Sequence, residues 1–232
     1  MSTIEGQKLR IDAQEGNRLI PSKFPPISLF EDVADEQEFE ALYELQALTN
    51  PRLLNEAGNL NLLPRSDIPF GIRGCSVAVA PFTHINPEGS RFSDGSFGVL
   101  YLAQDMETAL AEVRFHQSAY WAGVEGLNYD RLVLRGFKGT FGPSELHDTR
   151  DLGQTHPVHS PENYAHAHAR EMGVQLRESD VEGVAYLSAR NPGATCWGLF
   201  SPRNVTAMVQ TMHYELIWNG SEISSVNRID YA

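Results

Sequence analysis

The stretch GSRFSDGSFGVLYLAQDMETALAEVRFH, from Gly89 to His116, decides the fold. The dense turn formers between His84 and Gly98 predict a loop or tight hairpin. The apolar run Val99–Ala103 predicts a buried strand. A helix is expected from Asp105 to His116, because Asp105 is a suitable N-cap residue. This part of the chain therefore combines a polar loop, a short strand and a helix.

The segments on either side add further strands and one more helix. The short apolar run Cys75–Phe82 (CSVAVAPF) predicts a buried strand before the loop. No GxGxxG motif follows a strand and no P-loop is present, which argues against the usual dinucleotide and ATP folds. The irregular order of the elements favours the α+β class. Strands are expected at Leu132–Leu134, Phe137–Phe141, Gly183–Leu187, Trp197–Phe200 and Tyr214–Trp218, and a helix from Ser160-Pro161-Glu162 to about Arg177.

The N-terminal part differs from the rest of the chain in its amino-acid composition. Residues 1–27 mix polar residues with three prolines, which indicates an extended arm. Residues 31–44 contain seven acids and no base, with a helical apolar period and a capping-box pair at Asp35 and Glu38. Two interpretations stay open, a solvated acidic helix packed on the main domain or an acidic docking face for a basic partner. We expect an N-terminal segment of residues 1–63 and a main domain of residues 64–232.

The composition excludes several classes of protein. The 232 residues include 18 Lys+Arg and 30 Asp+Glu, a net charge of −12, which argues against direct nonspecific binding of nucleic acid. No apolar run approaches the roughly 20 residues that span a bilayer, and no secretory signal is visible. Two cysteines, Cys75 and Cys196, do not make a disulfide framework. We therefore expect a cytoplasmic chain without a membrane anchor.

Several residues could carry chemistry, although each alone would be ordinary. Arg91, between small residues in the loop, could present a two-pronged donor to a phosphate. Tyr101 alone would be a core tyrosine, and Glu112 alone a surface glutamate on a helix. The polar cluster from Ser188 through Arg190 would usually be a turn at the end of a strand.

Their combination resembles the RES-domain family, named for its Arg, Glu and Ser. GSRFSDGSFGVLYLAQDMETALAEVRFH is followed by GVAYLSARNPG and then by WGLF, in the order typical of that family. The resemblance spans roughly Asp67 to Trp218. It implies a fold similar to ADP-ribosyltransferases, with a split β-sheet core flanked by helices and a helical N-terminal extension. It also implies a toxin of a toxin–antitoxin pair that consumes NAD, with an antitoxin partner carrying an Xre-like helix-turn-helix region.

The candidate residues suit cleavage of the bond between nicotinamide and ribose, whose transition state resembles an oxocarbenium ion. Glu112 is the candidate carboxylate that stabilises the developing positive charge. Arg91 is expected to bind the pyrophosphate, with Arg190 as a second candidate. Tyr101 would contact the nicotinamide ring, and Ser188 would orient the ribose or the carboxylate.

One feature departs from the family pattern, which commonly has an arginine on the first strand, before the loop. Two residues are candidates for that basic position. His84 follows the expected strand at Cys75–Phe82 and leads toward the Arg91 loop, so we prefer it. Arg73 lies upstream in the segment PFGIRG. A structural role for both residues is the remaining alternative.

No metal site is expected from the sequence. His166 and His168 are two residues apart on an expected helix and cannot share a metal from one face. Glu112 and His116 could face one ion together, but two ligands do not make a site. Three functions stay open: transfer of ADP-ribose to an acceptor protein, which we favour, degradation of NAD by hydrolysis or phosphorolysis, and a non-catalytic binding module.

Overall fold

The computed structural model describes residues 4–23, 35, 37–38, 58–162 and 166–229. Within these residues, nine strands form one mixed sheet in the order β1-β5-β6-β7-β3-β2-β4-β8-β9, in which β5 and β6 are parallel and the other pairs antiparallel. The α+β expectation agrees with this architecture, whereas the likeness to ADP-ribosyltransferases stays a prediction. The strands are β1 (Gln7–Ile11), β2 (Gln14–Pro21), β3 (Leu100–Ala103), β4 (Asp130–Phe141), β5 (Ser144–Asp148), β6 (Gly183–Leu187), β7 (Thr195–Leu199), β8 (Val205–Trp218) and β9 (Ile223–Ile229).

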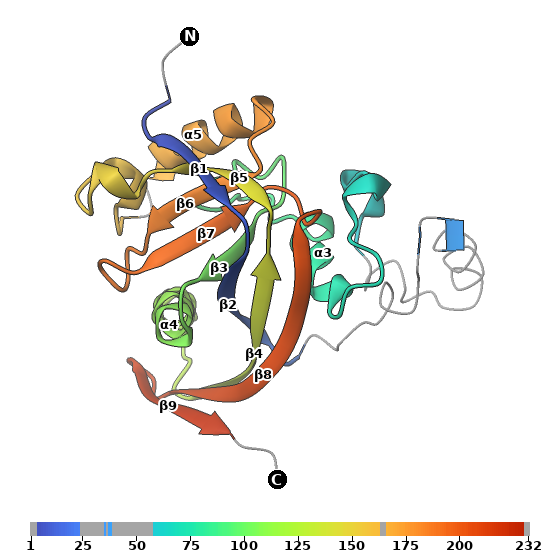
Figure 1. Ribbon diagram of the computed structural model, residues 1–232. Coiled ribbons are helices and arrows are strands. Elements are labelled where there is room, and N and C mark those ends of the chain that lie inside the picture. The colour runs from blue at the N-terminus through green and yellow to red at the C-terminus, as the bar shows by residue number, and fades with distance from the viewer. Residues whose placement is uncertain (1–3, 24–34, 36, 39–57, 163–165, 230–232) are drawn as a thin grey trace.

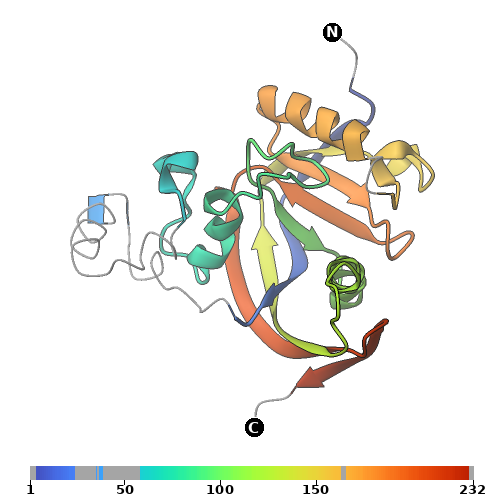
Figure 2. The ribbon, with the colours of Figure 1, turned by 180° about the vertical axis from the view of Figure 1, so that it is seen from behind.

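Helices cover both faces of the sheet. The α-helices are α3 (Cys75–Thr83), α4 (Met106–Ala122) and α5 (His166–Glu178), and the short 3-10 turns are η1 (Leu60–Leu62), η2 (Arg65–Asp67), η3 (Arg150–Leu152) and η4 (Pro157–His159). Helices α3 and α4 lie on opposite sides of the long strands β4 and β8 (Figure 1). Seen from behind, α5 lies beside β6 and β7, at the end of the molecule away from β9 (Figure 2). None of the described helices is both long enough and apolar enough to cross a bilayer.

The alternation of side chains along β3 divides the interior into two cores. Leu100 and Leu102 pack in the core that includes α3. Tyr101 and Ala103 point the other way, into the core that includes α4 and α5. Because successive side chains of a strand point to opposite faces, this register directs Tyr101 toward α4, which carries Glu112.

The strand expected at Cys75–Phe82 is wrong, because these residues form helix α3. The alternating Val-Ala pattern is typical of a strand, but the four positions Cys75, Ala78, Val79 and Phe82 follow the i, i+3, i+4, i+7 spacing of a helix stripe. All four are buried. His84 is the residue that ends this helix and does not follow a strand.

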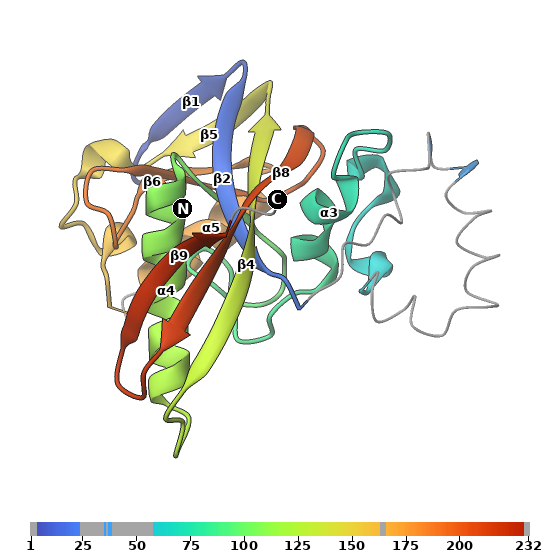
Figure 3. The same cartoon turned by 90° about the horizontal axis from the view of Figure 1, so that it is seen from below.

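The described part of the N-terminal arm is extended, as expected, and forms β1 and β2. β2 pairs with β4 along its whole length, from Gln14 to Pro21, and contacts β3 through Asn17. Its central place in the sheet is also visible from below (Figure 3). The arm is therefore an integral part of the sheet rather than a segment on its surface, and residue 64 does not mark the start of the sheet.

Most of the expected acidic helix at residues 31–44 lies outside the described residues. Asp35 and Glu38 are described, and the Glu38 backbone N–H donates to Asp35 Oδ1 at 2.9 Å, as a capping residue requires. The helical character of the remainder of this segment stays a prediction.

Several other expected elements agree with the structure, with different ends. Asp105 caps α4 by accepting the Thr108 backbone N–H at 2.7 Å, but the helix continues beyond His116 to Ala122. Its last turns lie beside the β8–β9 end of the sheet (Figure 3). There the Trp121 and Trp218 ring centres are 5.8 Å apart. The expected strands at residues 132–134 and 137–141 are parts of one strand, β4, which contains a bulge. The expected strand Gly183–Leu187 has the same bounds as β6.

Candidate functional site

A cavity of about 710 Å³ opens between the Gly89–Phe92 loop, strands β2 and β3, and helix α4. Its volume lies in the range of small-molecule and cofactor sites. Arg91, Tyr101 and Glu112 are among its lining residues, as are Arg18 and His116. The structure thus brings three of the expected site residues into one hollow.

Glu112 is held in place by Ser188, which lies in the second sequence motif, GVAYLSARNPG. The Ser188 hydroxyl donates to Glu112 Oε1 at 2.6 Å. The same hydroxyl oxygen accepts the backbone N–H groups of Arg190 at 3.1 Å and Asn191 at 3.0 Å. Because Ser188 is fully buried and its oxygen is held by two backbone donors, its proton is directed at the carboxylate. Ser188 therefore positions Glu112 and does not itself line the cavity.

Tyr101 holds the loop that carries Arg91. Its hydroxyl lies 2.8 Å from Ser90 Oγ and accepts the Phe92 backbone N–H at 3.0 Å. Burial raises the pKa of Tyr101, so the phenol stays protonated. The hydroxyl is thus committed to the loop, and the part of Tyr101 left for a ligand is the ring.

Helix α5 supports the same loop through Arg170, which also lines the cavity. The Arg170 guanidinium donates to the carbonyl oxygens of Ser90, at 2.9 Å, and Glu88, at 3.0 Å. Gly173 allows this close approach, because a Cβ at that position would lie 1.9 Å from the Phe92 carbonyl oxygen. The loop that carries Arg91 is therefore fixed by β3 on one side and by α5 on the other.

Arg91 and Arg190 both donate hydrogen bonds to backbone carbonyls of residues 158–161, which include the end of η4. Arg91 Nη1 donates to the carbonyl oxygens of Val158, at 3.2 Å, and Ser160, at 3.1 Å. Arg190 Nη2 donates to the Pro161 carbonyl, and its guanidinium lies over the Phe115 ring. Arg91 lines the cavity, whereas Arg190 does not. Desolvation lowers the pKa of Arg190, although Glu112 opposes the shift.

Arg18, on β2, lines the cavity and was missed by the sequence analysis. Its Nη1 donates to the Tyr101 carbonyl oxygen at 3.2 Å, while its buried Nε has no hydrogen-bond partner among the described residues. Burial lowers the pKa of Arg18 to about 10, with Tyr101 opposing the shift, so the group is still charged at neutral pH. A buried guanidinium with an unused donor is suited to bind an anion.

His84 and Arg73, the two candidates for the early basic position, lie away from the cavity. His84 Nδ1 is 3.2 Å from Thr83 Oγ1, at the end of α3. Arg73 lies in the turn before α3, and its carbonyl oxygen accepts the Met208 backbone N–H at 2.8 Å. Neither side chain lines the cavity, and the basic residue that does so from an early strand is Arg18. The sequence does not single out Arg18, because it is simply a basic residue within a segment that mixes polar and apolar residues.

Two further residues of the cavity can be assigned a protonation state. Desolvation lowers the pKa of His116, although Glu112 opposes this shift, so its imidazole is mostly neutral at pH 7. Burial raises the pKa of the Cys196 thiol to about 12, so it is not a thiolate nucleophile at neutral pH. The carboxylate of Glu112 is therefore the anionic group that this part of the wall offers to a ligand.

The arrangement suits a ligand that carries both a phosphate and a developing positive charge. Arg18 and Arg91 supply guanidinium groups, and Glu112 supplies a fixed carboxylate. The unpartnered Arg18 Nε is a donor that a phosphate oxygen can satisfy. A dinucleotide with a pyrophosphate and a cationic ring meets both requirements.

Comparisons with known proteins agree with the pattern in the sequence. The profile of the RES domain family matches residues 68–219. The uncharacterised protein y4oC of Sinorhizobium fredii (strain NGR234) is 33% identical over 219 residues, which make up 93% of this chain and 87% of that protein. The crystal structure of the M. tuberculosis MbcT–MbcA toxin–antitoxin complex is similar over 54% of this chain and 73% of the chain compared, with a TM-score of 0.37 and 14% identity.

Proposed function

This chain belongs to the RES domain family, and from that premise and the arrangement of the cavity we propose that it is an NAD-consuming toxin of a toxin–antitoxin pair. One observation carries the proposal. The Glu112 carboxylate is held by Ser188 at 2.6 Å, at the wall of a cavity that is also lined by three arginines, Arg18, Arg91 and Arg170. NAD has a pyrophosphate for the guanidinium groups and a cationic leaving group for the carboxylate.

In the proposed reaction, the bond between the ribose C1′ atom and the nicotinamide nitrogen breaks. The electron pair leaves with nicotinamide, which becomes neutral, and positive charge develops on the ribose. Glu112 stabilises that charge, and its fixed orientation means that it need not reorganise during the reaction. The incoming nucleophile then bonds to C1′ and loses its proton.

Arg18 and Arg91 are proposed to bind the pyrophosphate. The buried Nε of Arg18 gains the acceptor that it lacks among the described residues. Arg91 keeps donors beyond the Nη1 that bonds to the Val158 and Ser160 carbonyls, so it can add a phosphate contact. The ring of Tyr101, whose hydroxyl is committed to the loop, remains the candidate contact for nicotinamide.

The fate of the ADP-ribose is the second part of the proposal. We favour transfer to an acceptor protein, because the family match begins at residue 68 and a small-molecule hydrolase does not need the N-terminal extension and acidic segment that precede it. Degradation of NAD by hydrolysis or phosphorolysis is the alternative. The two differ only in the nucleophile that attacks C1′.

One incubation separates these outcomes. The purified chain is mixed with NAD labelled in its adenylate part, with and without cell lysate. Nicotinamide release with a labelled protein band supports transfer, and nicotinamide release with only small labelled products supports degradation. If no nicotinamide is released under either condition, the proposed function is wrong.

The proposed partner is an antitoxin with an Xre-like helix-turn-helix region. The net charge of −12 suits the half of such a pair that leaves DNA contacts to its partner. An anionic group of the antitoxin could bind Arg91 or Arg18 in place of the pyrophosphate. Inhibition by this partner should then be relieved by raising NAD, whereas inhibition insensitive to NAD would place its contact elsewhere.

A further inference from the structure

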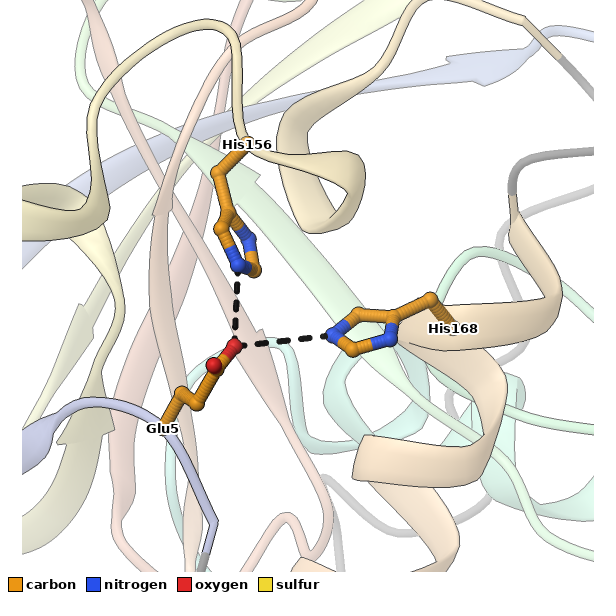
Figure 4. Close-up of side chains that lie close together, drawn as sticks. All are labelled: Glu5, His156 and His168. Atoms are coloured by element: carbon orange, nitrogen blue, oxygen red, sulfur yellow. Dashed lines mark hydrogen bonds and ion pairs between the residues drawn. The ribbon is translucent and has the colours of Figure 1, made fainter.

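We propose that Glu5, His156 and His168 bind a divalent transition-metal ion, of which Zn²⁺ is the appropriate probe. The three side chains come from the segment before β1, the segment before η4 and the first turn of α5, and they converge on one point (Figure 4). Their ligand atoms all lie within 4.8 Å of one another. Glu5 Oε2 is 2.9 Å from His156 Nε2 and 4.0 Å from His168 Nε2.

The position of Glu5 is determined by the backbone around it. His147 Nε2 lies 2.9 Å from the Glu5 carbonyl oxygen, which pins the start of β1 to β5. Gly6 has a φ of +126°, and a Cβ there would lie 2.5 Å from both the Asp148 carbonyl oxygen and His147 Nε2. Because only glycine fits this close approach, the chain turns here and the Glu5 side chain is directed at the histidines.

The donor set fits a borderline transition metal. Two imidazole nitrogens and one carboxylate are a common zinc ligand set, and a fourth position is then left to water. Bonds of about 2.0–2.1 Å in a tetrahedral site place ligand atoms about 3.3–3.4 Å apart. The observed 2.9 Å and 4.0 Å bracket that spacing. Because the Glu5 and His168 side chains are 57% and 44% exposed, they can shift to bring the ligand atoms to that spacing.

Metal binding requires one change in protonation. His156 Nδ1 accepts the Val158 backbone N–H at 3.3 Å, so the proton of the neutral ring is on Nε2, facing Glu5. A metal on Nε2 moves that proton to Nδ1, and Val158 N–H loses its acceptor. The cost is small, because a bond of 3.3 Å is long and the metal forms three bonds to protein ligands in exchange.

The site would link the N-terminal strand to the segment that bonds to Arg91. His156 immediately precedes η4, whose Val158 carbonyl accepts from Arg91. A bound ion would therefore hold together β1, the η4 segment and α5, which otherwise meet here through a hydrogen bond between Glu5 and His156 and a longer ion pair to His168.

The experiment uses the full-length chain, freed of metal and equilibrated with Zn²⁺ by dialysis. Bound zinc is counted by elemental analysis, and affinity is measured by competition with a chromogenic chelator. We expect a single bound ion, with His168→Ala and Glu5→Gln each weakening binding by more than about tenfold, since loss of outer-shell partners alone costs that much. The matched control is His84→Ala, an exposed histidine at the end of α3, which should bind zinc as the unaltered chain does.

Thermal unfolding provides an independent reading of the same proposal. Zn²⁺ should raise the Tm of the unaltered chain and of His84→Ala, but not that of His168→Ala. His168 is partly exposed, so its variant should have an unchanged Tm without metal. Zinc binding that is absent in the unaltered chain, or equal in all four proteins, overturns the proposal. Neither zinc binding nor the Tm depends on NAD turnover, so a failure of the metal proposal would not count against the proposed function.

Discussion

Three arginines line the cavity, Arg18, Arg91 and Arg170, and the surroundings of their guanidinium groups differ. Arg170 bonds to two carbonyl oxygens of the Arg91 loop. Arg91 bonds to the carbonyl oxygens of Val158, in η4, and of Ser160, the residue directly after η4. Arg18 bonds to one carbonyl oxygen and leaves its buried Nε without a partner among the described residues. Since an unsatisfied buried donor costs free energy, Arg18 gains more than Arg91 from a bound anion. A substitution of Arg18 therefore tests the position of the pyrophosphate more directly than a substitution of Arg91.

We predict that Arg18→Lys raises the KM for NAD about tenfold, with a smaller effect on kcat. Lysine keeps the charge but lacks the planar fork that bonds to the Tyr101 carbonyl and to a phosphate at the same time. Steady-state kinetics of nicotinamide release would measure both constants. Arg10→Lys, on the exposed part of β1, is the matched control. An unaltered KM for Arg18→Lys would place the pyrophosphate away from β2.

The site residues differ in how well the sequence predicted them. Glu112, Arg91 and Tyr101 lie within one continuous motif, and the structure places all three at the cavity. Ser188 was predicted to orient the ribose or the carboxylate. In the structure it bonds to Glu112, and its role in the reaction stays a prediction. Arg18 could not be found in this way, because its place depends on β2 entering the centre of the sheet, which no local pattern indicates.

At the scale of the elements, the end of β5 is held by an ion pair. The backbone N–H and the guanidinium of Arg150 all donate to the Asp148 carboxylate, with Nε–Oδ1 at 2.8 Å and Nη2–Oδ2 at 2.6 Å. Burial alone would raise the pKa of Asp148, but the bonds from Arg150 outweigh it, and the net shift is downward. The pair fixes the turn into η3, which leads to the η4 segment.

We predict that the stabilisation from this pair is pH-dependent. A carboxyl group whose pKa is lower in the folded state stabilises the fold fully above its unfolded pKa of about 3.9, and less as the pH falls toward the folded pKa. Asp148→Asn should therefore lower the free energy of unfolding by about 1–3 kcal/mol at pH 7, and by less at pH 3.

Urea unfolding at the two pH values measures this difference. Asp12→Asn is the control, because its partner Arg10 and Asp12 itself are both largely exposed, and it should have little effect at either pH. An Asp148→Asn effect of equal size at pH 7 and pH 3 would contradict the assignment of the lowered pKa.

Helix α3 shows why an element can be predicted at the right place with the wrong conformation. Its residues CSVAVAPF are apolar on nearly every position, so they fit the period of a strand as well as that of a helix. The choice is made by packing against β8 and β3, which buries Cys75, Ala78, Val79 and Phe82 on one stripe. The neighbouring helix α4 was predictable because Asp105 gave it a clear start.

At the scale of the whole molecule, the N-terminal strands connect the two sides of the sheet. β2 lies between β3, which carries Tyr101, and β4, which pairs with β8. The family match begins at residue 68, so this strand lies outside it. The position of β2 follows from long-range pairing, which local sequence patterns do not encode, and this is why the sequence indicated only an extended arm.

We predict that deletion of residues 1–23 abolishes cooperative folding. The deletion removes a strand from the middle of the sheet, leaving the backbone groups of β4 that face Gln14–Pro21 without partners. Deletion of residues 1–3 alone, which leaves β1 and β2 intact, is the control and should keep the normal Tm. Circular dichroism during heating measures both. A cooperative transition at the unaltered Tm after the longer deletion would mean that β2 is dispensable.

The central claim is that the cavity cleaves NAD with Glu112 as its carboxylate, and the release of free nicotinamide from NAD tests it most directly. The unaltered chain should release nicotinamide, and Glu112→Gln should lower kcat/KM by about 100-fold or more, because the amide keeps the size and loses the charge. Glu107→Gln, an exposed glutamate in the first turn of the same helix, should retain the normal rate. Nicotinamide release by Glu112→Gln at the rate of the unaltered chain would contradict the account.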